Sequence, residues 1–153
     1  VVTVVERHSG EGGVQTVPVL GMDLAPGAFA TTYAHDSHNL TVVASSAAAL
    51  AAAARRVVAF GGGISVVREG ADPVDLPLPV GGVMSTAGGT EVAAQARAVR
   101  AAVREWGWRH ANPFMSLTTM TLPVSPEVKI TDRGLVRVVR REWEPQVLGA
   151  AQR

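Results

Sequence analysis

The 153-residue sequence contains no cysteine. Disulfide bonds, thiolate zinc sites and a cysteine nucleophile are therefore excluded. The sequence also lacks any apolar run near the roughly 20 residues that a membrane-spanning helix needs. No signal peptide is visible at its start. We therefore expect a cytoplasmic protein with no membrane partner.

Charged residues are scarce, at 18% of the chain, against about a quarter in an average domain. Alanine, valine and glycine dominate instead, so the low charge reflects either a bias toward small residues or a surface that another domain covers. The formal net charge is only +1. This balance offers no global attraction for nucleic acid, and we expect no nucleic-acid partner.

Hydrophobic residues make up 47% of the chain, which is enough apolar material for the core of one ordinary domain. The sequence does not begin with Met, so we expect it to be either a processed product or a piece of a longer polypeptide. We predict one domain over residues 1–140. A loosely held tail is predicted over residues 141–153, where the apolar pattern fades.

Runs of β-branched and apolar residues, separated by turn residues, predict seven strands. They cover residues 1–5, 14–20, 28–34, 40–44, 64–68, 74–78 and 115–122. Two helices are predicted from apolar residues at helical spacing. The first is capped by Ser45 or Ser46 and ends at the glycines 61–63, and the second ends at Trp106 and Gly107. This order predicts an α+β fold, with a mixed, mainly antiparallel β-sheet covered by two main helices in a single domain.

Two clusters of polar side chains interrupt the apolar pattern, and each directly follows a predicted strand. The first comprises Glu6, Arg7 and His8, and the second comprises His35, Asp36, Ser37, His38 and Asn39. Burying so many polar groups is costly, so a site that faces a cleft is a natural explanation. We take all of them as candidate substrate-pocket or interdomain residues.

The residues alone leave several interpretations of the 35–39 loop open. His35 and His38 could ligate a metal together with Asp36, although a third or fourth ligand is not evident. Ser37 could be a nucleophile in a triad with a histidine and Asp36, although neighbours in sequence rarely reach the required geometry. The loop could recognise a polar heterocycle or a neighbouring domain. Alternatively, its Asp, Ser and Asn could bond their own backbone as turns.

Two further features have structural interpretations. The glycines 61–63 follow a helix and precede a strand, which is the wrong order for a phosphate-binding loop. The tryptophans Trp106, Trp108 and Trp143 are predicted to be core or interface anchors, because no alternation of basic and aromatic residues surrounds them.

Several strings in the sequence, taken in order, resemble a known family. They are residues 6–8, 34–39, 61–63, 76–79 with Gly82 and Met84-Ser85, 113–115 and 122–135. From about Val4 to about Val138 they resemble the C-terminal domain of adenine deaminases of the amidohydrolase superfamily. The Ala-His-Asp-Ser-His-Asn string is the most specific part. Ala44-Ser45 stands where the family often has a glycine, and residues from 140 onward match nothing in the family.

The resemblance implies that the full-length protein is a hydrolase of adenine catabolism, which converts adenine to hypoxanthine and ammonia. In such enzymes a metal-dependent (β/α)₈ barrel activates a water molecule, with manganese or iron as the implied metal. This sequence has no His-x-His motif and is too short for that barrel. We therefore expect this chain to hold no catalytic residue, to bind no cofactor and to be inactive alone. The implied partners are the barrel domain of the same polypeptide and adenine, with a homo-oligomer as the full-length state.

We hypothesise that residues 6–8 and 35–39 face the mouth of the barrel and help to close the purine pocket. Adenine offers ring nitrogens as acceptors and an amine as donor, which suit carboxylate, amide, imidazole and guanidinium groups. Two alternatives remain open: a purely architectural or oligomerisation domain, and a free-standing purine-binding module. The hypothesis requires Arg7 and His38 to share one surface.

Overall fold

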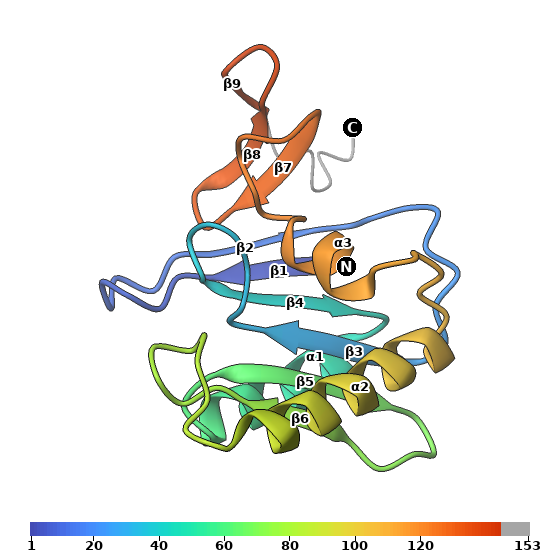
Figure 1. Ribbon diagram of the computed structural model, residues 1–153. Coiled ribbons are helices and arrows are strands. Elements are labelled where there is room, and N and C mark those ends of the chain that lie inside the picture. Colours follow the sequence, from blue (N-terminus) through green and yellow to red (C-terminus); the bar gives the residue numbers. More distant parts are fainter. Residues whose placement is uncertain (145–153) are drawn as a thin grey trace.

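The computed structural model describes residues 1–144, and the order of its elements alternates strands with three helices (Figure 1). The elements are β1 (Val2–Val5), β2 (Val14–Val17), β3 (Gly27–Thr31), β4 (Leu40–Ala44), α1 (Ala47–Ala59), β5 (Gly63–Arg68), β6 (Val74–Pro77), α2 (Gly89–Glu105), α3 (Pro113–Thr118), β7 (Val128–Thr131), β8 (Gly134–Arg137) and β9 (Glu142–Glu144). No helix among these residues is long and apolar enough to cross a bilayer.

The first six strands form one sheet in the order β2-β1-β4-β3-β5-β6, and all its pairings are antiparallel. This confirms the predicted mainly antiparallel sheet. The register places Val5 opposite Leu40, and Thr31 opposite Ile64. The ends of β1 and β3 and the starts of β4 and β5 therefore lie at the same end of the sheet, on the left in Figure 1.

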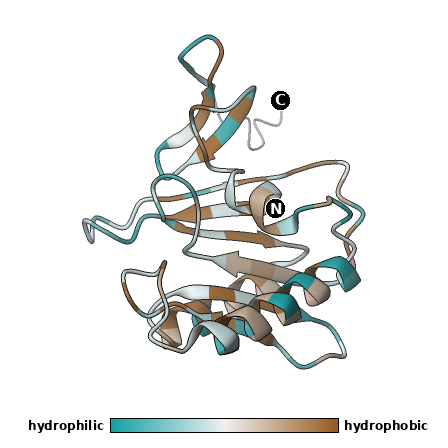
Figure 2. Ribbon diagram, viewed as in Figure 1, coloured by the Kyte–Doolittle hydropathy of each residue, from teal (hydrophilic) through white to brown (hydrophobic). Residues whose placement is uncertain are grey.

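Helices cover both faces of this sheet. Neighbouring side chains in a strand point to opposite faces, so each buried strand contributes apolar side chains to two cores. Phe29 and Val43 pack into the larger core under α2, whereas Ala28 and Val42 pack under α1. Figure 1 shows α1 behind the sheet and α2 in front of it. The apolar colour of the strands and the hydrophilic colour of the loops at the left end are visible in Figure 2.

The start and end of α1 follow the predicted signals. Ser46 accepts a hydrogen bond from the Ala49 amide at 3.2 Å, as an N-terminal cap should. The helix stops at Phe60, after which the Gly62 amide donates to the Val57 carbonyl at 2.9 Å. The glycines 61–63 thus end the helix, as predicted.

The strand predicted over residues 115–122 is wrong, because Pro113–Thr118 form α3. The side chain of Asn112 accepts from the Met115 amide at 3.3 Å, which caps the helix, and Pro113 occupies a first-turn position that needs no amide donor. Pro113 and Leu117, four residues apart, are both buried. The apolar run after Pro113 predicts a strand by its composition alone, because it is too short to reveal its helical period.

A second sheet of order β7-β8-β9 follows α3 and was not predicted. Ile130 of β7 is 4% exposed and shares the larger core with Val2 and Val17. The predicted domain boundary at residue 140 and the loosely held tail remain predictions. Of that tail, Glu142–Glu144 pair with β8, and residues 145–153 lie outside the described part of the chain.

Candidate functional site

The two polar clusters lie side by side, because β1 and β4 are neighbours in the sheet. Arg7 Nε donates to the His38 carbonyl at 2.5 Å. His8 Nε2 lies 2.8 Å from the Ser37 carbonyl and donates to it when that nitrogen carries the proton. Arg7 and His38 therefore share one surface, as the pocket hypothesis requires.

A surface groove of about 530 Å³ opens between the loops at this end of the sheet. Its lining comes from both clusters, from the rest of the β1–β2 connection and from the turn between β7 and β8. It consists of Glu6, His8, Ser9, Glu11, Gly13, Ser37, Asn39, Asp132 and Arg133. Asn39, 3% exposed, donates from Nδ2 to Asp132 Oδ1 at 3.2 Å. Asp132 and Arg133 were not predicted as site residues, although the 122–135 string that carries the family resemblance contains both.

Glu6 acts as a turn-stabilising residue in this groove. Its carboxylate accepts from the Ser9 amide and the Ser9 hydroxyl, each at 2.8 Å, and from the His8 amide at 2.5 Å. These bonds favour the ionised form, so the pKa of Glu6 falls to about 2, with the Ser9 amide as the largest cause. The carboxylate is thus committed to its own loop.

Replacing Ser9 with alanine is expected to raise the pKa of Glu6 toward its ordinary value, because one of the three donors disappears. Since the folded pKa is depressed, the stabilisation by these bonds is present above the ordinary glutamate pKa of about 4.5 and is lost as pH falls toward 2. An NMR titration of the Glu6 carboxyl carbon measures the shift. Ser9→Thr keeps the hydroxyl and serves as the control; an unchanged Glu6 pKa in Ser9→Ala would contradict the assignment.

Three aromatic rings group on the 35–39 loop and the residues before it. Tyr33 and His35 make an edge contact with ring centres 5.0 Å apart, and His38 lies 5.7 Å from His35 and 6.0 Å from Tyr33. The His35 amide donates to the Thr118 carbonyl at 2.9 Å, which anchors the loop to α3. Tyr33 was missed because the predicted strand 28–34 included it, whereas β3 ends at Thr31.

His38 occupies an unusual position within this group. Its backbone has φ of 51°, in the left-handed region that non-glycine residues rarely adopt. Its Nδ1 atom is buried without a hydrogen-bond partner among the described residues. Burial lowers the pKa of His38, and His35 acts in the same direction, so the neutral imidazole is favoured at pH 7.

The structure separates the interpretations of the 35–39 loop. Within residues 1–144, no group of three or more His, Asp or Glu side chains could hold a metal ion. Ser37 Oγ accepts from the Asn39 amide at 3.3 Å, as the turn interpretation predicted, and makes no bond with an imidazole of the described chain. Asp36 is exposed and accepts no hydrogen bond from the described residues. Its carboxylate is therefore open to an external partner, whereas His35 and His38 are half-buried.

The glycine strings quoted for the resemblance reach the same end of the sheet. The 79–84 loop follows β6 and closes through mutual backbone bonds of 3.1 Å between Val80 and Met84. Thr32 links it to β5, because its hydroxyl donates to the Gly82 carbonyl at 2.6 Å and accepts from the Gly63 amide at 2.8 Å. This loop lies beside the 35–39 loop, because Arg7 bonds to the carbonyls of both Gly81 and His38.

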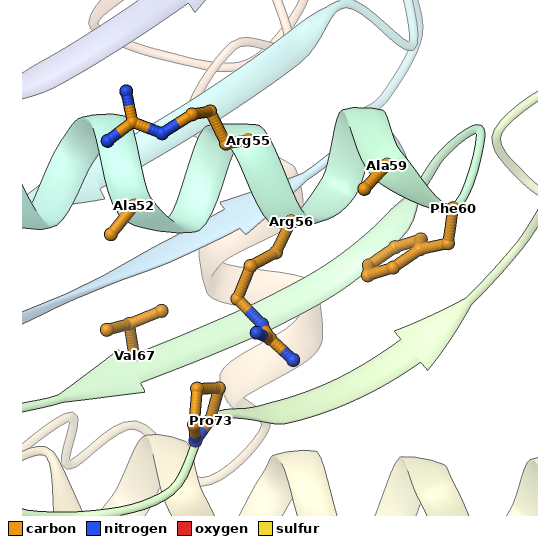
Figure 3. Close-up of a pocket in the computed structure, with 7 residues that line it drawn as sticks. All are labelled: Ala52, Arg55, Arg56, Ala59, Phe60, Val67 and Pro73. Atoms are coloured by element: carbon orange, nitrogen blue, oxygen red, sulfur yellow. The ribbon is translucent and has the colours of Figure 1, made fainter.

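A separate hollow of about 460 Å³ lies between α1 and the β5–β6 hairpin (Figure 3). Figure 3 shows Arg56 reaching across it while Arg55 points away. Arg56 Nη2 pairs with Asp75 Oδ2 at 2.5 Å, which ties α1 to β6. None of the predicted site residues lines this hollow.

The fold and the loops define a small α+β domain that carries a polar surface at one end of its sheet. Residues 1–142 match the family model described as adenine deaminase C-terminal domain, and the chain belongs to this family. The resemblance noted in the sequence is thereby confirmed.

Curated relatives agree with this assignment. The chain is 45% identical over 148 residues to an adenine deaminase of Moorella thermoacetica, which covers 97% of this chain and 25% of that protein. It is 45% identical over 137 residues to an adenine deaminase of Brucella anthropi, with 90% and 24% covered. For adenine deaminase 2 of Shouchella clausii the identity is 42% over 133 residues, with 87% and 23% covered. The chain thus spans about a quarter of the length of the relatives it matches.

Proposed function

We propose that this domain is part of a hydrolase that deaminates adenine to hypoxanthine and ammonia, and that its 35–39 loop helps to close the purine pocket. The supporting observation is that the 6–8 and 35–39 clusters meet at one end of the sheet, in a family whose members are adenine deaminases. The remaining polypeptide is the barrel that would carry the chemistry. We further propose a cytoplasmic homo-oligomer as the complete protein.

The reaction needs a water molecule activated for attack on the ring carbon that bears the amine, and the family implies manganese or iron for this step. The described residues do not fit such a metal, because they contain no group of three ligands. Our proposal therefore assigns the metal to another part of the polypeptide. The role left to this domain is to bind and orient the purine, so the isolated chain should not turn over adenine.

The contacts divide the candidate residues into two kinds. Glu6, Arg7 and Asn39 each make side-chain hydrogen bonds inside the domain. Asp36 is exposed and can accept from the adenine amine, while the neutral imidazole of His38 can donate to or accept from a ring nitrogen. We assign the purine contacts to these latter groups.

In the complete enzyme, Asp36→Asn and His38→Gln are each expected to lower kcat/KM roughly 10- to 100-fold. Each substitution removes a polar contact to the substrate, which the closed pocket of the complete enzyme would bury. The melting temperature should change little, since Asp36 is exposed. Asp72→Asn, at an exposed turn residue after β5, is the matched control and should keep wild-type kinetics. Steady-state kinetics with adenine and thermal melts provide both measurements.

Each alternative function has its own signature in these experiments. Wild-type kinetics in both loop variants would reject the pocket role and favour the architectural role. Calorimetry of the 153-residue chain with adenine tests the free-standing module. Saturable binding of adenine by this chain alone would favour that module, whereas the pocket proposal expects no measurable heat.

A further inference from the structure

The Arg7 side chain joins two loops that are far apart in the sequence. Its Nε atom donates to the His38 carbonyl at 2.5 Å, and its Nη2 atom donates to the Gly81 carbonyl at 2.6 Å. One guanidinium therefore bridges the 35–39 loop and the 79–84 loop. Both acceptors are backbone carbonyls, so the bridge constrains the path of the chain in each loop.

The packing around the guanidinium is tight. A Cβ atom placed on Gly82 would lie 2.7 Å from Arg7 Nη2 and 2.9 Å from Thr32 Oγ1. Gly82 also has φ of 77°, in the left-handed region. Only a glycine at this position lets the backbone approach the guanidinium so closely.

The bridge also offsets the cost of the His38 conformation. His38 holds φ of 51°, and bonds secure both of its backbone polar groups: its amide donates to Ala34 at 2.7 Å and its carbonyl accepts from Arg7. A left-handed non-glycine residue persists where the surroundings over-determine it. Removal of the Arg7 bond frees His38 to relax, and its imidazole would move with the backbone.

We propose that Arg7 is a positioning residue, which fixes the 35–39 loop against the 79–84 loop and so sets the orientation of the loop's imidazoles and Asp36. The proposal rests on the proposed pocket function. It gives Arg7 a different role from a substrate ligand, because its Nε and Nη2 atoms are already bonded to the two backbone carbonyls.

Arginine suits this role better than lysine. The planar guanidinium presents several donors in a fixed fork and can serve two acceptors in different directions. A lysine ammonium would retain the positive charge but lose that rigid geometry. Arg7→Lys therefore separates the effect of geometry from the effect of charge, and Arg7→Gln removes both.

The first test uses the 153-residue chain and does not depend on catalysis. Amide NMR spectra of Arg7→Lys and Arg7→Gln are expected to show shifts in both the 35–39 and 79–84 loops. Arg55→Gln, at an exposed arginine of α1, is the control and should shift neither loop. Shifts confined to the residues next to Arg7 in the sequence, with none in the two loops, would overturn the proposal.

The titration of His38 adds a readout that a general loss of stability would not produce. Burial lowers the pKa of His38 most, and the charges of His35 and Arg7 lower it further, while the Thr32 backbone and the charge of Asp36 oppose them. The His38 pKa should therefore rise in Arg7→Gln, where the positive charge is absent. In Arg7→Lys it should stay closer to the wild-type value even though the loop has moved.

The second test uses the complete enzyme. Both Arg7 variants are expected to lose roughly 10- to 100-fold in kcat/KM, because small misplacements of binding groups are costly in an active site, while Arg55→Gln keeps wild-type kinetics. Loop shifts with unchanged kinetics in the Arg7 variants, but reduced kinetics in Asp36→Asn, would refute the positioning role alone. Loop shifts with unchanged kinetics in all these variants would refute the proposed pocket function and leave the bridge itself intact.

Discussion

Replacing Trp106 with alanine is expected to lower the free energy of unfolding by about 3–5 kcal/mol. Trp106 is the largest of the fully buried side chains and has 0% exposure. Its indole Nε1 donates to the Ala25 carbonyl at 2.8 Å, and its ring lies against Gly27, where a Cβ would come within 2.9 Å of Nε1. The substitution removes this bond and leaves a cavity in the core under α2.

Chemical denaturation monitored by circular dichroism would measure this loss in the 153-residue chain. Trp143→Ala is the matched control, because Trp143 is 60% exposed and its removal should change the stability by no more than about 0.5 kcal/mol. Equal stability losses in the two variants would contradict a core centred on Trp106. A loss under about 1 kcal/mol in Trp106→Ala would do the same.

Gly62→Ala is expected to cost about 3 kcal/mol or more, because it combines a forced backbone collision with an unfavourable φ. A Cβ on Gly62 would lie 2.5 Å from the Gly82 Cα and 3.2 Å from Thr32 Oγ1. The φ of Gly62 is 123°, which side chains rarely adopt. The colliding Gly82 Cα is a backbone atom, so no rotamer change can relieve the collision.

The adjacent Gly61 provides a matched control for this prediction. Gly61 also has a positive φ, of 77°, but an added Cβ would meet only Pro79 at 3.9 Å, an ordinary contact distance. Gly61→Ala should therefore cost about 1–2 kcal/mol, from the left-handed backbone alone. Denaturation midpoints of the two variants measure the difference, and similar losses would show that the approach of Gly62 to Gly82 is not limiting.

The Gly62 contact also connects the stability of the domain with its proposed site. Gly82 lies between Gly62 and the Arg7 guanidinium, so a shift of Gly82 would disturb the bridge between the two loops. The glycines 61–63 thus act through close packing and helix termination. A phosphate-binding role, which their position after a helix already argued against, has no part in this arrangement.

Local patterns predicted many elements because they depend on neighbours in the sequence. Alternating or β-branched runs located β1, β3, β4 and β5, and the serine cap and the glycines located α1. Prediction from local patterns was wrong for the 115–122 segment and did not find β7–β9. Residues 113–118 form a helix that begins at the cap from Asn112. The strands β7 and β8 are short, and their apolar side chains are buried by contact with the larger core, which lies far away in the sequence.

The site was predicted only in part for a similar reason. The eight polar residues were identified because they interrupt apolar runs, but their roles depend on partners that are distant in sequence. Arg7 contacts Gly81, 74 residues away, and Asn39 contacts Asp132, 93 residues away. Tyr33 was assigned to a strand that in fact ends two residues earlier.

The sequence by itself determined the absence of thiol chemistry, the α+β class, the two main helices, the two polar clusters and the family resemblance. These follow from composition and from periodicities that each residue shares with its neighbours. Only the tertiary structure decided that β1 lies beside β4, which brings Arg7 onto the His38 carbonyl and turns two separate clusters into one surface. Strand pairing depends on contacts between residues that are distant in the sequence, so no single segment determines which strands become neighbours.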